Sequence, residues 1–298
     1  MHDVFAYGVI ASSTFLELGS DYPSEGGYAE VVGIHRSIGG EAAAGAYVLA
    51  RLGVATKLDG NRLTDDESSA TVIQLLSSAG VDCSAISLDG NSGPVTEVII
   101  ATGEARTIFG TYANLAQERA WNSPAEEDIR SSRIVCLDPF APTWSQEVAR
   151  LCVEADTPYV TVDAPPDSEI AAQAAVLVIA QEFADRTFGD ADPRDVLAAY
   201  TDRCTGLVIL TRGGTPGLFG RNSSPPRAFS PFPVEARDTT GAGDAFRAGL
   251  TYGLLRGETD DGVIRTASAT AAMVCERAPG VVTSPTEREL LDFMAART

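Results

Sequence analysis

Lysine and histidine are scarce in this 298-residue sequence: Lys57 is the only lysine, and His2 and His35 are the only histidines. A Walker-type phosphate loop needs a lysine, and Lys57 stands in VATKLDG, which is no such loop. Two histidines make a Ser-His-Asp or Cys-His catalytic centre and a Cys/His zinc site improbable. The sequence must carry any chemistry with other residue types.

Paired cysteines and long apolar runs are also missing. The five cysteines form no C-x-x-C pair, and their odd number favours buried free thiols in a reducing cytoplasm over a disulfide framework. No apolar run reaches 18 residues, so no transmembrane helix is expected. The opening segment, MHDVFAYGVI, lacks the basic region of a secretory signal. We therefore expect a cytoplasmic protein.

Basic charge is low relative to acidic charge, with 22 Lys and Arg against 41 Asp and Glu, a formal net charge of −19. Such a surface repels nucleic-acid backbones and anionic lipid, so neither nucleic acid nor membrane is an expected partner. An anionic nucleotide could still bind, but only at a locally prepared site such as a helix N-terminus.

Apolar strand-like runs alternate with helical segments along most of the chain. This pattern predicts a single α/β domain, a Rossmann-like three-layer α/β/α sandwich with a mostly parallel sheet. Two segments, at about 12–38 and 93–112, are β-rich, polar and punctuated by glycine, which predicts a small separate sheet. We expect the main strands at 3–10, 54–58, 133–138, 159–163, 174–180 and 206–211, with later strands over GLFG and AFSPFPVEA, and the last helices at 241–255, 259–276 and 286–297.

Several helix ends carry recognisable signals. The spacing of Thr64 to Glu67 and of Thr143 to Gln146 is that of a capping box, and Asp192-Pro193 is typical of an N-cap followed by the first helical residue. Gly53 and Gly80 are placed to end helices in the left-handed conformation.

The segment with the clearest chemistry is DTTGAGD at 238–244, followed by the helical run AFRAGLTYGLLRG. The first backbone N–H groups of a helix have no intrahelical partner, and with the helix dipole they form an anion site. Gly241, Ala242 and Gly243 are small enough for a phosphate to approach the backbone. Asp244 is explained either as a favourable first-turn acid or as a base that takes the proton of an attacking hydroxyl, and the full pattern favours the base.

DTTGAGD resembles the signature of the ribokinase-like sugar kinases, also called the phosphofructokinase-B family. Other stretches resemble the family in the same order. These are SIGGEAAA at 37–44, GVDCSAI at 80–86, GEART at 103–107, TRGGTPG at 211–217 and CERAPG at 275–280 with SPT downstream.

The resemblance implies ATP-dependent phosphorylation of a hydroxyl on a sugar-like molecule, with Mg²⁺ on the phosphates, and a small β-sheet lid over the site. It implies that Asp244 is the general base and that the N–H groups of Gly241, Ala242 and Gly243 hold the transferring phosphoryl group. It also suggests a homodimer formed through the lids. The implied nucleotide-site residues are Thr211, Gly213, Gly217, Ser268 and Glu182, and the implied ligands of a monovalent cation such as K⁺ are Asp238, Thr240 and Ser284.

The substrate side departs from the family pattern. Ser13 stands where many members have an acidic residue that binds sugar hydroxyls, and Ala44 stands where many have asparagine. The family's N-x-x-E motif should fall near Ala180 to Phe183 and matches at neither end; Glu182 is the nearest carboxylate. We place Ser13, Gly39, Gly40, Ala44, Arg106 and Asp138 at the substrate. Arg106 is alternatively a solvated hairpin charge and Asp138 a loop or N-cap acid.

Other functions stay open at this stage. The acceptor can be a sugar, a polyol or a nucleoside. A dinucleotide-binding Rossmann protein is disfavoured because GVIASS, after the first strand, is not G-x-G-x-x-G. A non-catalytic relative that binds a nucleotide or metabolite is compatible with the altered residues, although the retained Asp244 argues against it.

Overall fold

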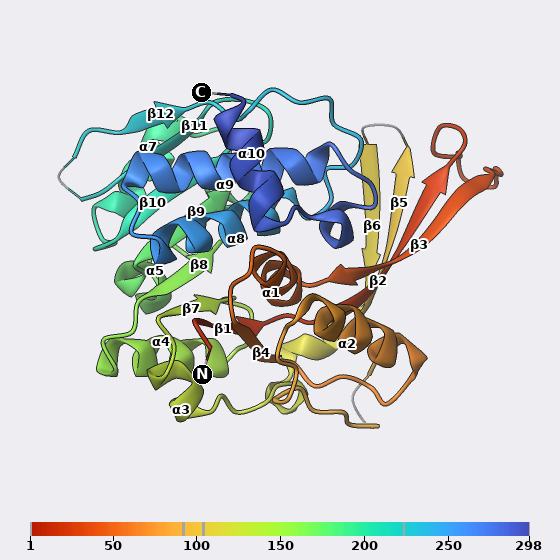
Figure 1. Ribbon diagram of the computed structural model, residues 1–298, viewed down its shortest axis with the longest axis horizontal. Helices are drawn as coiled ribbons and strands as arrows, with labels where there is room; N and C mark the ends of the chain where they lie inside the picture. Colours follow the sequence, from red (N-terminus) through yellow and green to blue (C-terminus); the bar gives the residue numbers. More distant parts are fainter. Residues whose placement is uncertain (1, 91–92, 103–104, 223, 298) are drawn as a thin grey trace.

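The computed structural model describes residues 2–90, 93–102, 105–222 and 224–297, which form two sheets and the helices around them (Figure 1). The larger sheet has the strand order β12-β11-β10-β9-β8-β7-β1-β4. In this sheet, β4, β1, β7, β8, β9 and β10 run parallel to one another. Strand β11 pairs antiparallel with β10, and β12 pairs antiparallel with β11. The strands are β1 (Val4–Gly8), β4 (Thr56–Gly60), β7 (Ile134–Leu137), β8 (Tyr159–Val162), β9 (Val176–Ala180), β10 (Leu207–Thr211), β11 (Gly217–Gly220) and β12 (Arg227–Phe229).

Successive side chains along each strand point to opposite faces of the sheet, and this divides the core into two layers. In β1, Val4 and Ala6 pack into one hydrophobic cluster, whereas Phe5 and Tyr7 pack into another on the opposite face. The first face is covered by α1 (Glu41–Arg51), α2 (Glu67–Ala79), α8 (Ala242–Leu255), α9 (Asp260–Cys275) and α10 (Glu287–Ala295). The second face is covered by α3 (Glu126–Arg130), α4 (Trp144–Glu154), α5 (Glu169–Gln173), α6 (Gln181–Phe188) and α7 (Pro193–Thr201). The three-layer α/β/α prediction is confirmed.

The smaller sheet projects from one side of the molecule beside α1 and α2 (Figure 1). Its order is β3-β2-β5-β6, with β2 and β5 parallel and the outer pairs antiparallel. The strands are β2 (Ala11–Leu18), β3 (Val31–Gly39), β5 (Thr96–Thr102) and β6 (Ala105–Gly110). They come from the two segments predicted to form a separate sheet, and we call them the small sheet. Gly103 and Glu104, the first residues of the GEART stretch, lie outside the described residues.

The strand order changes direction at the carboxyl ends of β1 and β7, and we call the space beyond these strand ends the crevice. From β1 the sheet grows to β4 on one side, and from β7 it continues to β8, β9 and β10 on the other. Open α/β sheets bind ligands at such a switch point because the connections leave in opposite directions. Asp138 follows β7 here and accepts a hydrogen bond from the N–H of Val9, which follows β1, at 2.9 Å.

Helix starts differ from the sequence expectations in two places. α2 begins after Asp66, whose carboxylate accepts from the N–H of Ser69, so Thr64 is not the N-cap. Thr143 is the N-cap of α4, but its side chain makes no cap hydrogen bond, because its backbone is already helical. A capping box requires an extended N-cap residue. The predicted caps at Asp192, Gly53 and Gly80 are present.

Three other differences concern short elements. The helices α5 and α6 have five and eight residues, too few for a clear apolar period in the sequence. The predicted strand AFSPFPVEA pairs only in β12, because its prolines cannot donate to a ladder.

All five cysteines are free. In the described part of the chain, no helix has the length and apolarity needed to cross a membrane.

Candidate active site

The helix α8 begins in the crevice with the glycine-rich segment. Gly241, its N-cap, has φ +76°, and a Cβ there would lie 2.1 Å from Val281 Cγ2, so this turn needs glycine. A Cβ on Gly243 would meet open space, which leaves the backbone accessible. The N–H of Ala242 donates to the carbonyl of Thr239 at 3.2 Å. The N–H groups of Gly243 and Asp244 lie in the first turn, where helix geometry supplies no carbonyl partner.

Asp244 lies in the same first turn, surrounded by charged groups. Burial raises the pKa of its carboxyl from 3.8 to about 7; Arg247 opposes the rise, and the charges of Asp138 and Glu97 add to it. A carboxyl that titrates near neutral pH is suited to accept a proton from a hydroxyl and to release it later.

Arg247 lies one turn after Asp244 on α8 and is 2% exposed. It donates from Nη1 to Asp138 Oδ1 and from Nη2 to the carbonyl of Glu41, both at 2.5 Å. Asp138 is fully buried, and its second oxygen accepts from Val9. The predicted substrate ligand Asp138 therefore already has partners for both oxygens, and Arg247 ties β7, α1 and α8 together.

Glu41 opens α1 next to this pair. Burial raises the pKa of its carboxyl to about 8, and the negative charges of Asp138 and Asp244 contribute. The charge of Asp244 contributes to the raised pKa of Glu41, so the ionisation of these two carboxyls is linked.

The predicted substrate residues gather between the small sheet and α1. Gly40 is the N-cap of α1 with φ +81°, and a Cβ on it would lie 2.4 Å from the carbonyl oxygen of Val9, so the approach of α1 to the crevice requires glycine. Ser13 is buried on β2, and its hydroxyl has no hydrogen-bond partner among the described residues. Ala44 is buried inside α1, one turn from Gly40.

Arg106 reaches the crevice from β6. Its guanidinium donates to Thr239 Oγ1, and its charge lowers the pKa of Asp244. The residue is exposed, yet this contact joins the small sheet to the start of α8.

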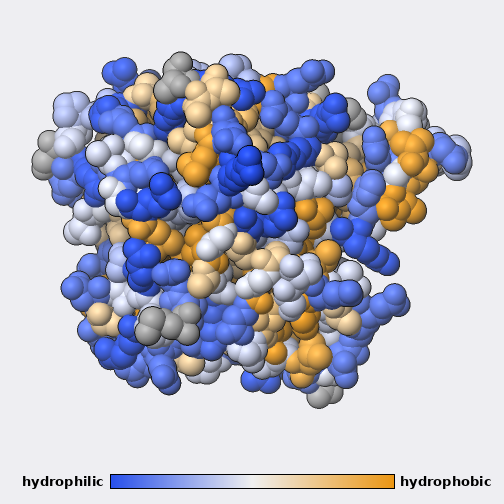
Figure 2. Space-filling view, viewed as in Figure 1, coloured by the Kyte–Doolittle hydropathy of each residue, from blue (hydrophilic) through white to orange (hydrophobic). Residues whose placement is uncertain are grey.

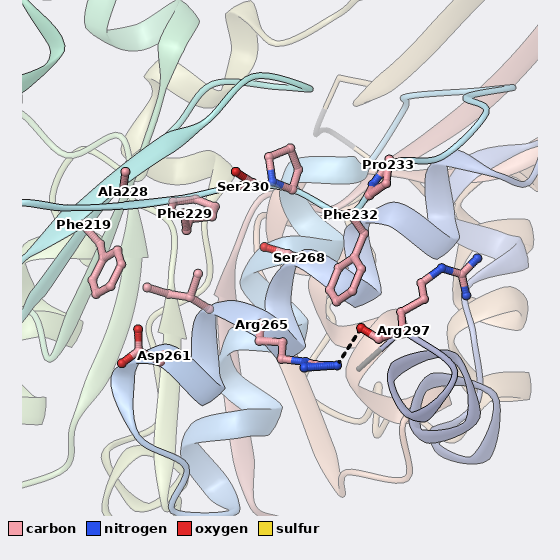
Figure 3. A pocket seen from close by; sticks show the side chains of 12 residues that line it. Phe219, Ala228, Phe229, Ser230, Phe232, Pro233, Asp261, Arg265, Ser268 and Arg297 are labelled. Carbon is pink, nitrogen blue, oxygen red and sulfur yellow. Dashed lines mark hydrogen bonds between the residues drawn. The ribbon is translucent and has the colours of Figure 1, made fainter.

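Three of the predicted nucleotide residues lie on and between β10 and β11, and a fourth lines a cavity. Thr211 ends β10, Gly213 has φ +57°, and Gly217 begins β11 against the ring of Phe229. Phe229 and Ser268 both line a cavity of about 230 Å³ (Figure 3). The other lining residues are Phe219, Ala228, Ser230, Pro231, Phe232, Pro233, Asp261, Ile264, Arg265 and Arg297.

This cavity combines apolar faces with one unsatisfied hydroxyl. Phe229, Phe232 and Ile264 form its walls, and Arg265 lies 5.6 Å from the centre of the Phe232 ring. Ser268 is 4% exposed, and its Oγ makes no hydrogen bond within the described ranges. Such a lining suits a flat aromatic base with polar edges.

Glu182 lies apart from Asp244, in the first turn of α6, and is exposed. Its charge raises the pKa of Asp163, a carboxyl whose pKa is about 6 mainly because of burial. Asp163 follows β8, has φ +46°, and accepts from the N–H of Ala180 at 2.8 Å. Mg²⁺ is commonly held by one or two carboxylates together with phosphate and water oxygens, so this pair fits it. No cluster of three or more metal-binding side chains occurs in the described residues.

The three residues predicted to bind a monovalent cation converge next to the start of α8. Asp238 Oδ2, Thr240 Oγ1 and Ser284 Oγ are all buried and lack hydrogen-bond partners among the residues described. A Cβ on Gly280 would lie 2.5 Å from the Thr240 carbonyl oxygen and 3.1 Å from Asp238 Oδ2. Buried oxygens without partners are costly, and a cation coordinated by oxygen would satisfy them. The donor set therefore fits K⁺.

Sequence reasoning missed Glu41, Glu97 and Arg247. Arg247 could have been noticed as the one charged side chain in the apolar run AFRAGLTYGLL, three residues after Asp244. Glu97 could have been noticed as the one acid in the strand sequence PVTEVIIA. Their meaning depends on contacts across the fold, which a local pattern does not contain.

Comparison with known proteins gives a consistent result. The chain is 26% identical to the ribokinase of Bacillus subtilis over 243 residues, covering 80% of this chain and 81% of the relative. It is also 26% identical to the ATP-dependent ribose-1-phosphate kinase of Halopiger xanaduensis over 296 residues, covering 92% of each.

Solved structures share the fold across their whole length. Arabidopsis thaliana ribokinase, solved with ribose and ATP, matches with a TM-score of 0.83 at 20% identity and 98% coverage of both chains. Thermotoga maritima ribokinase matches with a TM-score of 0.82 at 18% identity, covering 99% of this chain and 100% of the other. The model of the pfkB family carbohydrate kinases matches residues 2–287. The chain belongs to the pfkB family of carbohydrate kinases, enzymes that phosphorylate sugars with ATP.

Proposed function

We propose that this kinase phosphorylates a hydroxyl of a sugar or sugar-like small molecule with Asp244 as general base. The observation that carries this proposal is the position of Asp244: it lies in the first turn of α8, beside accessible backbone N–H groups, and burial raises its pKa to about 7. A carboxylate beside an anion site is useful when a proton must leave a hydroxyl that attacks a phosphate.

In the proposed reaction the acceptor hydroxyl gives its proton to Asp244. Its oxygen forms a bond to the γ-phosphorus of ATP, the bond from that phosphorus to the β,γ-bridging oxygen breaks, and ADP leaves. The backbone at Gly241, Ala242 and Gly243 stabilises the transferring group. Since the Ala242 N–H also donates to Thr239, we assign the main contacts to the N–H groups at Gly243 and Asp244.

We assign the nucleotide to the region between Thr211 and the cavity of Figure 3. The base would lie among Phe229, Phe232 and Ile264, with the Ser268 hydroxyl available to one of its polar edges. Gly213 and Gly217 allow the loop after β10 to approach the sugar and phosphates.

Two ions are part of the proposal. Glu182 and Asp163 would hold Mg²⁺, which neutralises charge on the phosphates when bound. Asp238, Thr240 and Ser284 would hold K⁺, whose role is to fix the turn before α8.

The small sheet would act as a lid and as a dimer interface. On the face opposite Glu97, the alternate residues Ile34, Val98 and Phe109 are exposed, and Figure 2 shows hydrophobic side chains on this projecting part. Exposed apolar side chains on the face of a sheet favour burial against a second copy. Phe109→Asp is expected to convert a dimer to a monomer in analytical ultracentrifugation; a wild-type monomer would contradict the dimer.

The decisive experiment is ATP-to-ADP turnover with Mg²⁺ and K⁺ across a panel of acceptors, with Asp244→Asn as control. The panel holds aldoses including ribose, ketoses, sugar phosphates including ribose 1-phosphate, deoxy-keto sugar acids, inositols and nucleosides. One strong acceptor that the variant no longer phosphorylates supports the proposal. Silence of every acceptor, with ATP still raising the melting temperature, favours a non-catalytic nucleotide-binding role.

A further inference from the structure

One carboxylate on the small sheet lies outside the glycine-rich segment that we assign to phosphoryl transfer. Glu97 lies on β5 and, by strand register, stands directly beside Ser13 of β2. Ser13 in turn pairs with Ser37 of β3, and Glu97 with Gly110 of β6. Directly paired residues point to the same face of a sheet, so Glu97 and the two serines form one row. Arg106 belongs to the same face and reaches the start of α8, so the row faces the crevice.

Contacts fix the carboxylate of Glu97 at the entrance to α1. A Cβ on Gly39 would lie 2.4 Å from Glu97 Oε2, so the carboxylate rests against the backbone of the glycine pair. The hydroxyl of Tyr112 donates to Glu97 Oε1. The Tyr112 ring occupies the space above Gly110, where a Cβ would lie 2.4 Å from its Cε2. One carboxylate oxygen is thus oriented by Tyr112, and the other lies against the glycine pair.

The surroundings of Glu97 are those of a recognition site for hydroxyl groups. Burial raises the pKa of its carboxyl, and the nearby Ser13 hydroxyl and Gly40 N–H only partly offset the rise. Its charge also raises the pKa of Asp244, which places the two carboxylates in one electrostatic environment. Ser13 Oγ makes no hydrogen bond of normal geometry in the described residues, yet it lies close enough to lower the pKa of Glu97, so the two polar groups face the same space.

We propose that Glu97 is the acceptor-recognising carboxylate of this enzyme, supplied by the lid strand β5 and not by the chain segment after β1. This inference rests on the proposed kinase function and deepens it. The position after β1, where an acid would bind sugar hydroxyls, holds Ser13, and Glu97 lies directly beside it on the neighbouring strand. The favoured acceptor is a polyhydroxylated molecule with a hydroxyl donor turned toward the small sheet, and the reacting hydroxyl toward Asp244.

The geometry assigns a polarity to the acceptor. A carboxylate only accepts hydrogen bonds, so the group at Glu97 must be a donor. A phosphate or carboxylate at that position would be repelled by Glu97, and an anionic acceptor would have to direct its charge toward Arg106. The enzyme should therefore distinguish an acceptor from its deoxy analogue at the hydroxyl nearest Glu97.

The test uses Glu97→Gln, with Glu127→Gln on α3 as the matched control, because Glu127 is exposed and belongs to the helix layer that covers the main sheet. The amide oxygen that Glu97→Gln introduces can still accept from Tyr112, so folding should be retained, and melting temperatures check this. We expect Glu97→Gln to raise the acceptor KM about 10- to 100-fold, with little change in the KM for ATP, since hydrogen bonds to charged groups are among the stronger ones. The control should match wild type.

Two further measurements separate recognition from a structural role. Wild type should discriminate against deoxy analogues of its best acceptor, and Glu97→Gln should lose that discrimination at one hydroxyl only. Moving the carboxylate one strand across, in Ser13→Asp combined with Glu97→Ser, should restore part of the acceptor affinity. An unchanged acceptor KM in Glu97→Gln, or equal loss for all analogues, overturns the inference.

Calorimetric titration of acceptor into Asp244→Asn, with and without Glu97→Gln, gives a readout that needs no turnover. Weaker acceptor binding only in the double variant supports the inference, and equal binding overturns it. Turnover in wild type with no effect of Glu97→Gln rejects this inference alone. If wild type shows no turnover and no binding of any acceptor, both this inference and the proposed function are rejected.

Discussion

The start of α8 and the small sheet form opposite walls of the same crevice, and they are built in different ways. The α8 wall uses one continuous segment, from Asp238 to Arg247, and its local conformation positions each group. The small-sheet wall uses Ser13, Gly39 and Glu97, which only strand register and helix docking bring together. The family's transfer motif is retained in the first wall, whereas the residues expected to hold the acceptor have changed in the second.

This difference separates the reaction from the choice of acceptor. Phosphoryl transfer needs a fixed anion site and a base, and in our proposal both come from one helix start. Acceptor choice depends on which side chains face the crevice, and a carboxylate can be supplied from a neighbouring strand without disturbing the helix. Changes in the α8 wall should therefore reduce kcat, and changes in the small-sheet wall should act on the acceptor KM.

The largest effect is expected for Asp244→Asn. The amide cannot take the acceptor proton, so kcat should fall about 10²- to 10⁴-fold while ATP affinity stays nearly unchanged. Steady-state kinetics and ATP titration measure the two quantities. Asp292→Asn, at an exposed position on α10, is the control. A variant with a near-normal rate would remove Asp244 as the base.

Gly243→Val tests the accessible backbone of the same wall. Because the Cβ position is open, the variant should fold, and its side chain should occupy the space of the phosphoryl group. We expect kcat/KM for ATP to fall about 10²- to 10³-fold, with a smaller loss for Gly243→Ala. Undiminished turnover in the valine variant would contradict the anion-site assignment.

The pH dependence follows from the raised pKa of Asp244. Since the base must be ionised, kcat/KM of wild type should increase as pH rises through about 7. The same raised pKa means that ionisation in the folded state is unfavourable. The contribution of Asp244 to the free energy of unfolding should therefore decline as pH rises from about 4 to about 7.

Arg247→Met should move this profile, because the guanidinium opposes the rise in the pKa of Asp244. The ascending limb of the pH profile should shift to higher pH in Arg247→Met. In Arg247→Lys, which keeps a positive charge, the shift should be smaller. The methionine variant also leaves Asp138 buried without its partner, so the free energy of unfolding should fall by about 3–5 kcal/mol. Urea denaturation measures the loss. A profile with an unchanged apparent pKa would show that Arg247 does not control the base.

The smallest effect is expected at the candidate cation site. KCl should raise the melting temperature by a few degrees over choline chloride at equal ionic strength, because the ion binds only the folded state. Ser284→Ala should reduce this difference without changing the melting temperature in choline. An equal response of wild type and variant would exclude Ser284 as a ligand.

Local patterns predicted the parts of the molecule that depend on neighbouring residues. Alternating apolar runs identified the parallel strands, and glycine punctuation identified the segments of the small sheet. Prediction was weaker where local signals compete: Thr64 and Asp66 both suit an N-cap, and Asp66, with its extended backbone and its contact with the Ser69 N–H, is the N-cap of α2. For the site, the sequence identified Asp244 and the oxygen donors Asp238, Thr240 and Ser284, whose roles remain predictions.

The sequence by itself determined the layered α/β fold and the family, and it predicted the anion site at the start of α8, because these depend on periodicity and on one contiguous motif. The tertiary structure decided the environment of that motif. Only folding brings Arg247 to Asp138, raises the pKa of Asp244, and sets Glu97 beside Ser13 against Gly39. The physical reason is that burial, charge interaction and strand register are set by residues far apart in the chain.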